Sequence, residues 1–79
     1  MRLKPSFIRA EWDEEAGVWV ETSDDVPGLA TEEKNLEALI EKLKVMIPEL
    51  LEANGTAMEH EVSFEVLTRR FEIVQYAGA

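Results

Sequence analysis

The chain has 79 residues, 17 of them acidic and 8 of them Lys or Arg, and a formal net charge of −9 at pH 7. A surface of this sign repels phosphate backbones, which disfavours nucleic acid as a direct partner, and this length holds one domain, residues 1–79, with a small core. Because the chain has no cysteine, a disulfide framework and a thiolate metal site are excluded.

The first predicted elements are two strands that form a β-hairpin. Residues 7–12 alternate in polarity and residues 18–22 are rich in β-branched and aromatic side chains. The acidic segment between them ends on Gly17, which suits the positive φ of a hairpin loop. One face of the first strand carries Ile8, Ala10 and Trp12. Trp12 and Trp19 are predicted to be cross-strand neighbours that stabilise the sheet.

A second turn follows over residues 23–28. Pro27-Gly28 fits the two central positions of a type II turn, since Gly accepts a positive φ at the second of them. Leu29-Ala30-Thr31 is then predicted to be a short third strand or an extended link.

An amphipathic helix is predicted from Leu36 onward. Its apolar residues recur at helical spacing, and they are Leu36, Leu39, Ile40, Leu43, Met46, Ile47, Leu50 and Leu51. Asn35 is the expected N-cap, Glu37 lies where the helix dipole favours an anion, and Gly55 suits the left-handed position after the C-terminus.

Pro48 conflicts with this helix, because proline lacks an N–H and its ring clashes with the carbonyl of Lys44. The apolar period continues beyond it, which predicts a kink near residues 44–48. The alternative is two helices, the second beginning with Pro48 at its first position.

The last predicted element is a long strand that follows a loop from about Asn54 to His60. Residues 62–66 alternate cleanly, and the apolar residues after them change phase. A bulge near residues 67–70 accounts for the change, because one extra residue reverses which side chains face the core. The alternative is pairing of this segment with a second copy of the chain.

Acidic side chains are concentrated early in the chain. Seven acids and no base lie between residues 11 and 25: Glu11, Asp13, Glu14, Glu15, Glu21, Asp24 and Asp25. They are interpreted mainly as solvated turn charges, and next as a docking surface for a basic partner. The residues assigned to that surface are Asp13, Glu14, Glu15, Asp24 and Asp25. A metal or catalytic site is the weaker interpretation, because the spacing of a calcium loop is absent.

The other polar residues give weaker indications. His60 has no candidate nucleophile beside it and is interpreted as a surface residue. No serine has a nucleophile-elbow context, and no phosphate-binding glycine loop occurs. Arg69-Arg70 is expected to form salt bridges with a neighbouring acid, within the chain or across a dimer.

Nothing in the sequence suggests a membrane or a secreted location. No apolar run approaches the roughly 18 residues of a membrane span, and the N-terminus lacks the apolar core of a signal peptide. A cytoplasmic protein without membrane contact is therefore expected.

Three segments carry a resemblance to a known family. Residues 11–20, 23–31 and 35–39 resemble the HicB-like superfamily, whose members have a similar hairpin, a D-[LV]-P-G turn and a helix opening with a capping residue, Leu and Glu. Val45-Met46-Ile47-Pro48-Glu49-Leu50-Leu51 is more closely similar to a group of short bacterial HicB-like proteins of unassigned function. The resemblance covers about residues 6–52.

The resemblance implies a partial RNase H-like β-β-β-α-β fold without that fold's catalytic carboxylates. For full HicB proteins it also implies an antitoxin role, in which they bind and block HicA, a small basic toxin that cleaves mRNA. An acidic chain is electrostatically suited to such a partner. Many HicB proteins continue into a DNA-binding domain, which a chain of this length is expected to lack.

We therefore expect a small α+β domain, a β-β-β-α-β antiparallel sheet with one helix packed on one face. It is expected to be a non-enzymatic interaction module with no catalytic residue, metal or cofactor, and to form a homodimer or higher homo-oligomer through sheet edges. Two alternatives are a nuclease or hydrolase whose carboxylates converge on a divalent ion, and a stand-alone regulatory or ligand-binding domain with no toxin partner.

Overall fold

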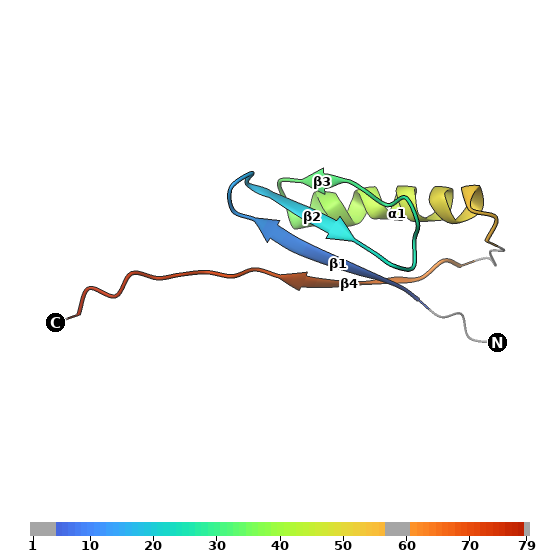
Figure 1. Ribbon diagram of the computed structural model, residues 1–79. Helices are drawn as coiled ribbons and strands as arrows, with labels where there is room; N and C mark the ends of the chain where they lie inside the picture. The colour runs from blue at the N-terminus through green and yellow to red at the C-terminus, as the bar shows by residue number, and fades with distance from the viewer. Residues whose placement is uncertain (1–4, 57–60, 79) are drawn as a thin grey trace.

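The protein is a four-stranded sheet with one helix on one face, described by a computed structural model at residues 5–56 and 61–78 (Figure 1). Its elements are β1 (Ser6–Asp13), β2 (Val18–Thr22), β3 (Glu32–Glu33), α1 (Leu36–Ala53) and β4 (Phe64–Arg69). The strand order is β3-β2-β1-β4. This confirms the predicted α+β class and the β-β-β-α-β order.

The β1–β2 hairpin forms as predicted. Asp13 pairs with Val18, and Gly17, with φ +69°, donates its N–H to the Asp13 carbonyl at 2.7 Å. Trp12 lies directly opposite Trp19, and their ring centroids are 5.5 Å apart at an interplanar angle of 64°. This edge-to-face arrangement is a favourable geometry for aromatic pairs, so the tryptophans stabilise the hairpin as expected.

The last strand differs from the expectation in direction and length. β4 pairs with β1 in parallel, from Ser6 opposite Phe64 to Glu11 opposite Arg69, so the sheet is mixed. The register advances one residue at a time, and the predicted bulge over residues 67–70 is therefore wrong. The change of apolar phase that suggested a bulge belongs instead to residues 70–78, which lie beyond the strand.

The second turn and the third strand also follow the sequence. Gly28 has φ +86°, and the Leu29 N–H donates to the Val26 carbonyl at 3.2 Å, which is the type II turn predicted for Pro27-Gly28. Residues 29–31 form the extended link, and the short strand β3 begins after them at Glu32.

Helix α1 begins and ends at the predicted caps. The Asn35 side chain accepts the Ala38 N–H at 2.8 Å. At the other end Gly55, with φ +77°, donates to the Glu52 carbonyl at 3.0 Å, and Thr56 donates to the Leu51 carbonyl at 2.9 Å, as in a Schellman motif.

Proline does not divide the helix. Pro48 lies inside the single helix Leu36–Ala53, so the alternative of two helices is wrong, and a kink near residues 44–48 stays a prediction. The expected loop over Asn54 to His60 is described only as far as Thr56, and His60 lies outside the described residues. In the described part of the chain, no helix is long and apolar enough to cross a membrane.

The core lies between the helix and the sheet. The buried residues of α1 are four residues apart and lie on one face of the helix: Leu39, Leu43, Ile47 and Leu51. They pack with residues from β1, β2 and the second turn, namely Ile8, Ala10, Trp19 and Val26. The predicted apolar faces of the first strand and the helix are thus the two sides of one core.

The N-cap gives a direct test of how the helix begins. Replacing Asn35 with Ala removes the acceptor for the Ala38 N–H and is expected to lower the free energy of unfolding by about 1 kcal/mol. Urea unfolding followed by circular dichroism measures the change. Asn35→Asp is the matched control, because it retains a capping oxygen, and a loss as large as that of the Ala variant would contradict the capping role.

Candidate functional site

The five acids assigned to a docking surface fall into two separate groups. Asp13 ends β1, and Glu14 and Glu15 lie in the turn after it, whereas Asp24 and Asp25 follow the other end of β2. Figure 1 shows these two connections at opposite ends of the hairpin. Five residues of strand separate them by about 15 Å, so the acids do not make one patch.

The first group is partly used by the turn itself. The Asp13 carboxylate accepts the Ala16 N–H at 3.1 Å, which satisfies a turn donor. The Glu14 carboxylate accepts the Trp12 indole N–H at 2.7 Å and holds the exposed edge of that ring. Glu15 is exposed and takes no part in these bonds, so it is the carboxylate of this turn that is open to a partner.

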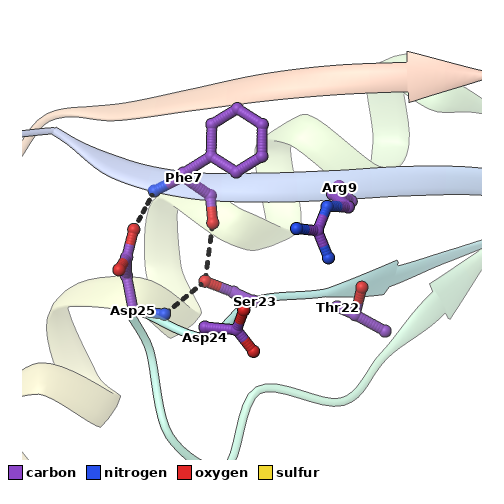
Figure 2. A pocket seen from close by; sticks show the side chains of 6 residues that line it. All are labelled: Phe7, Arg9, Thr22, Ser23, Asp24 and Asp25. Carbon is purple, nitrogen blue, oxygen red and sulfur yellow. Dashed lines mark hydrogen bonds between the residues drawn. The ribbon is translucent and has the colours of Figure 1, made fainter.

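The second group extends the hairpin after its regular pairing ends. Figure 2 shows the Asp25 carboxylate accepting the Phe7 N–H at 2.8 Å, while the Ser23 hydroxyl donates to the Phe7 carbonyl at 2.7 Å. The Asp25 N–H in turn donates to the Ser23 oxygen at 3.1 Å. These side chains replace the main-chain partners that another β2 residue would have supplied, and Asp24 stands beside the network without joining it.

A small hollow opens at this corner, lined by Phe7, Arg9, Thr22, Ser23, Asp24 and Asp25. The Ser23 hydroxyl links β1 to the turn after β2, since it donates its proton to the Phe7 carbonyl and accepts the Asp25 N–H. Nucleophilic catalysis needs an adjacent base to remove that proton. The arrangement of Arg9 and Asp24 at the hollow suits ion pairs with charged side chains of a partner.

Glu21 is the acid that the sequence placed wrongly. The sequence predicts a solvated turn charge at this position, but Glu21 is 2% exposed and lies opposite Ala10 on the side of the sheet that carries the core. One carboxylate oxygen accepts the Thr31 N–H, and the other has no hydrogen-bond partner among the described residues. The spacing in the sequence could have indicated this burial, because Glu21 is two residues from Trp19 and strand residues two apart lie on the same face.

Burial raises the pKa of Glu21, since removing the carboxylate from water penalises its charged form. The hydrogen bonds from its own backbone and from Thr31 act in the opposite direction, as does the positive charge of Lys42. Lys42 is itself shared, because its ammonium forms a 3.2 Å ion pair with Glu33.

A metal centre has no counterpart in this geometry. Across residues 5–56 and 61–78, no three acidic or histidine side chains come together in an arrangement that could hold a metal ion. The acids are therefore clustered in the sequence but not in space, because folding places them at both ends of the hairpin and at one buried position.

The two arginines near the C-terminus act within the chain. Arg69 lies 3.6 Å from Glu11 and Arg70 pairs with Glu72, as expected of salt bridges to neighbouring acids. The Arg70 guanidinium also lies 4.5 Å from the centroid of the Trp12 ring. Cation–π contact of this kind attaches the start of the last segment to the edge of the hairpin.

Beyond Arg70 the chain leaves the domain as an extended segment, residues 70–78, which we call the C-terminal arm (Figure 1). Its large apolar side chains are between 72% and 88% exposed, and they are Phe71, Ile73, Val74 and Tyr76. Single exposed apolar residues are ordinary on protein surfaces, but a contiguous group marks an interaction site. The sequence predicted these residues as strand, and the structure shows that the segment has no strand partner among the described residues.

Comparisons with known proteins extend over almost the whole chain. Residues 6–77 match the family model DUF1902, a domain of unknown function. The crystal structure of the hypothetical protein TTHA1013 from the extremely thermophilic bacterium Thermus thermophilus is similar, with 51% sequence identity and a TM-score of 0.71. The match covers 92% of this chain and 100% of that one. No curated protein matches the chain.

Two neighbouring aspartates separate a structural role from a free charge. Asp25→Ala removes the acceptor of the Phe7 N–H and is expected to lower the free energy of unfolding by about 1 kcal/mol. Asp24→Ala makes the same change of charge outside the network and is expected to stay within about 0.5 kcal/mol of the parent. Chemical unfolding at one pH measures both, and equal losses would contradict the assignment.

Glu21 is expected to make stability depend on pH. Because its folded pKa is raised, its contribution is fully present below the pKa of the unfolded chain and is lost as the pH rises through the folded pKa. Glu21→Gln should therefore gain stability relative to the parent as the pH is raised from the acidic range to neutral and above. Urea unfolding of both proteins across this range measures the difference, with the exposed Glu49→Gln as control; a difference that does not grow with pH would refute the assignment.

Proposed function

This chain belongs to the DUF1902 family, and from that premise we propose that it is a non-enzymatic HicB-like interaction module that binds a small basic protein. The observation that carries the proposal is the placement of its charge. Among the described residues, Glu21 is the one buried charged residue, so the other acids described remain at the surface of a chain with net charge −9. Such a surface steers and holds a cationic partner.

The partner class follows from the resemblance to HicB-like proteins and from this charge. We propose a HicA-type toxin, a small basic protein that cleaves mRNA, whose RNA-binding surface this chain would cover. An acidic domain competes with RNA for a basic surface because both present negative charge to the same lysines and arginines. Blocking the substrate in this way needs no catalytic group on the acidic protein.

The acids of the two hairpin ends contribute unequally to this proposal. Asp13, Glu14 and Asp25 accept hydrogen bonds within the domain, whereas Glu15 and Asp24 are exposed outside those networks. A partner can pair with an exposed carboxylate without disrupting the fold. We therefore assign the larger share of partner recognition to Glu15 and Asp24, with the structural acids adding to the field around them.

The test is binding between this chain and any small basic protein that a neighbouring reading frame encodes. Glu15→Lys and Asp24→Lys together are expected to weaken the complex by about tenfold, mainly through slower association, and the parent complex should weaken as salt rises. Surface plasmon resonance measures both rates. The control is the double variant Glu49→Lys and Glu52→Lys near the C-terminal end of α1, which makes the same change of net charge.

Two results would contradict the proposal in different ways. Equal weakening by both double variants would show that net charge alone acts, and would remove the assignment to the hairpin ends. If the neighbouring reading frames encode no small basic protein and the chain binds no basic RNase, the toxin partner is wrong, and the stand-alone regulatory or ligand-binding domain becomes the better interpretation.

A further inference from the structure

The C-terminal arm and the outer edge of β4 form one extended strip, rich in exposed apolar side chains, that has no partner within the described chain. The described chain has six exposed large hydrophobic residues, and five of them lie in this strip: Leu67, Phe71, Ile73, Val74 and Tyr76. Among the described strands, β4 lies at the edge and pairs only with β1, so its other side presents main-chain donors and acceptors that no described strand uses. Long edges of this kind recruit another strand.

We propose that the strip pairs with the same strip of a second copy of this chain. The two segments 64–77 would run antiparallel about a two-fold axis, so that each arm covers the β4 edge of the other copy and the two sheets join. A single interface then pairs both the β4 edge and the C-terminal arm of each copy, because each copy supplies an edge strand and also the arm that pairs with the edge of the other copy. This reciprocity is the property of an isologous interface.

The balance of charge at this edge favours a second copy of the chain as its partner. Two acids and two arginines lie in residues 64–76, so the strip is neutral although the whole chain carries −9. Two copies repel each other over most of their surface, but not here. β3, the other edge of the sheet, has two residues and offers little backbone for pairing.

The arrangement of charges also selects a register. If the two-fold axis passes beside Phe71, Arg70 of each copy lies opposite Glu72 of the other, and opposite charges face each other twice. The same register places Tyr76 opposite Val66, a half-buried residue that packs against the core. A register centred one residue earlier would place Arg70 opposite Arg70, and like charges directly opposite each other are destabilising.

Apolar residues lie on both faces of the arm. In a paired strand, Phe71 and Ile73 point to one face and Val74 and Tyr76 to the other. An open hollow lined by Glu11, Trp12, Arg69 and Phe71 lies at the base of the arm, next to the proposed axis. In the dimer this hollow faces the second copy.

Single cysteines test the register cleanly, because the chain has none of its own. Phe71→Cys is expected to give nearly complete dimer with a short bis-maleimide cross-linker, since residues at the axis lie about 5 Å apart. Leu67→Cys on β4 is the matched control: the two Leu67 positions would be about 27 Å apart in this register, and no cross-link should form. Val45→Cys, on the exposed side of α1, controls for random collision.

Solution mass tests the interface without a cross-linker. Sedimentation at tens of micromolar should give the parent the mass of two chains, and Ile73→Asp should give the mass of one chain with an unchanged circular dichroism spectrum. Val45→Asp, at a residue 58% exposed on the helix, should remain a dimer. A monomeric parent, a dimer unaffected by Ile73→Asp, or cross-linking at Leu67 in place of Phe71 would each overturn the proposal.

Discussion

The contact between one face of α1 and one face of the sheet organises the rest of the molecule. Leu39, Leu43 and Ile47 are fully buried against Ile8 and the strands beside it, and a domain of this size has no second core to support its edges. The helix is held in place at both ends by capping bonds. Its last turn is also tied to the second turn, where the Asn54 amide donates to the Pro27 carbonyl at 3.1 Å.

The face of the sheet that carries the core also buries an acid. Glu21 shares a face with Trp19 because strand residues two apart point the same way, and that face is covered by the link to β3. The chain satisfies one oxygen with the Thr31 N–H and leaves the second without a described partner. A buried polar atom without a hydrogen-bond partner lowers the stability of the folded state, and this one lies beside a core that is otherwise apolar.

Local patterns predicted the elements well, and long-range pairing was harder to predict. The alternation in β1, the period of α1, the Asn35 cap and the Pro27-Gly28 turn each depend on a few adjacent residues, and each was found from the sequence. The direction of β4 depends on where the chain returns to the sheet. An 18-residue helix spans about 27 Å, enough to bring the chain back to the end where β1 begins, and β4 therefore runs parallel to β1.

The acids show the same limit at the candidate site. Their clustering in the sequence was real, but one five-residue strand between Gly17 and Ser23 places them at opposite ends of a hairpin. Whether a carboxylate is free or used by a turn depends on amides that become its neighbours only on folding, as for Asp25 and the Phe7 N–H. Composition therefore indicated the sign of the surface, and geometry was needed to separate Glu15 and Asp24 from the acids around them.

The parallel pairing of β1 with β4 has a consequence for the order in which the domain assembles. β1 finds β2 across a short loop, but its other partner is more than fifty residues further along the chain, with Ser6 opposite Phe64. The hairpin and helix can form while the chain is still being synthesised, whereas one side of β1 stays open until residues 64–69 emerge. Non-local pairing of this kind is slow, so we expect the closing of the sheet, rather than the formation of its turns, to limit the rate of folding.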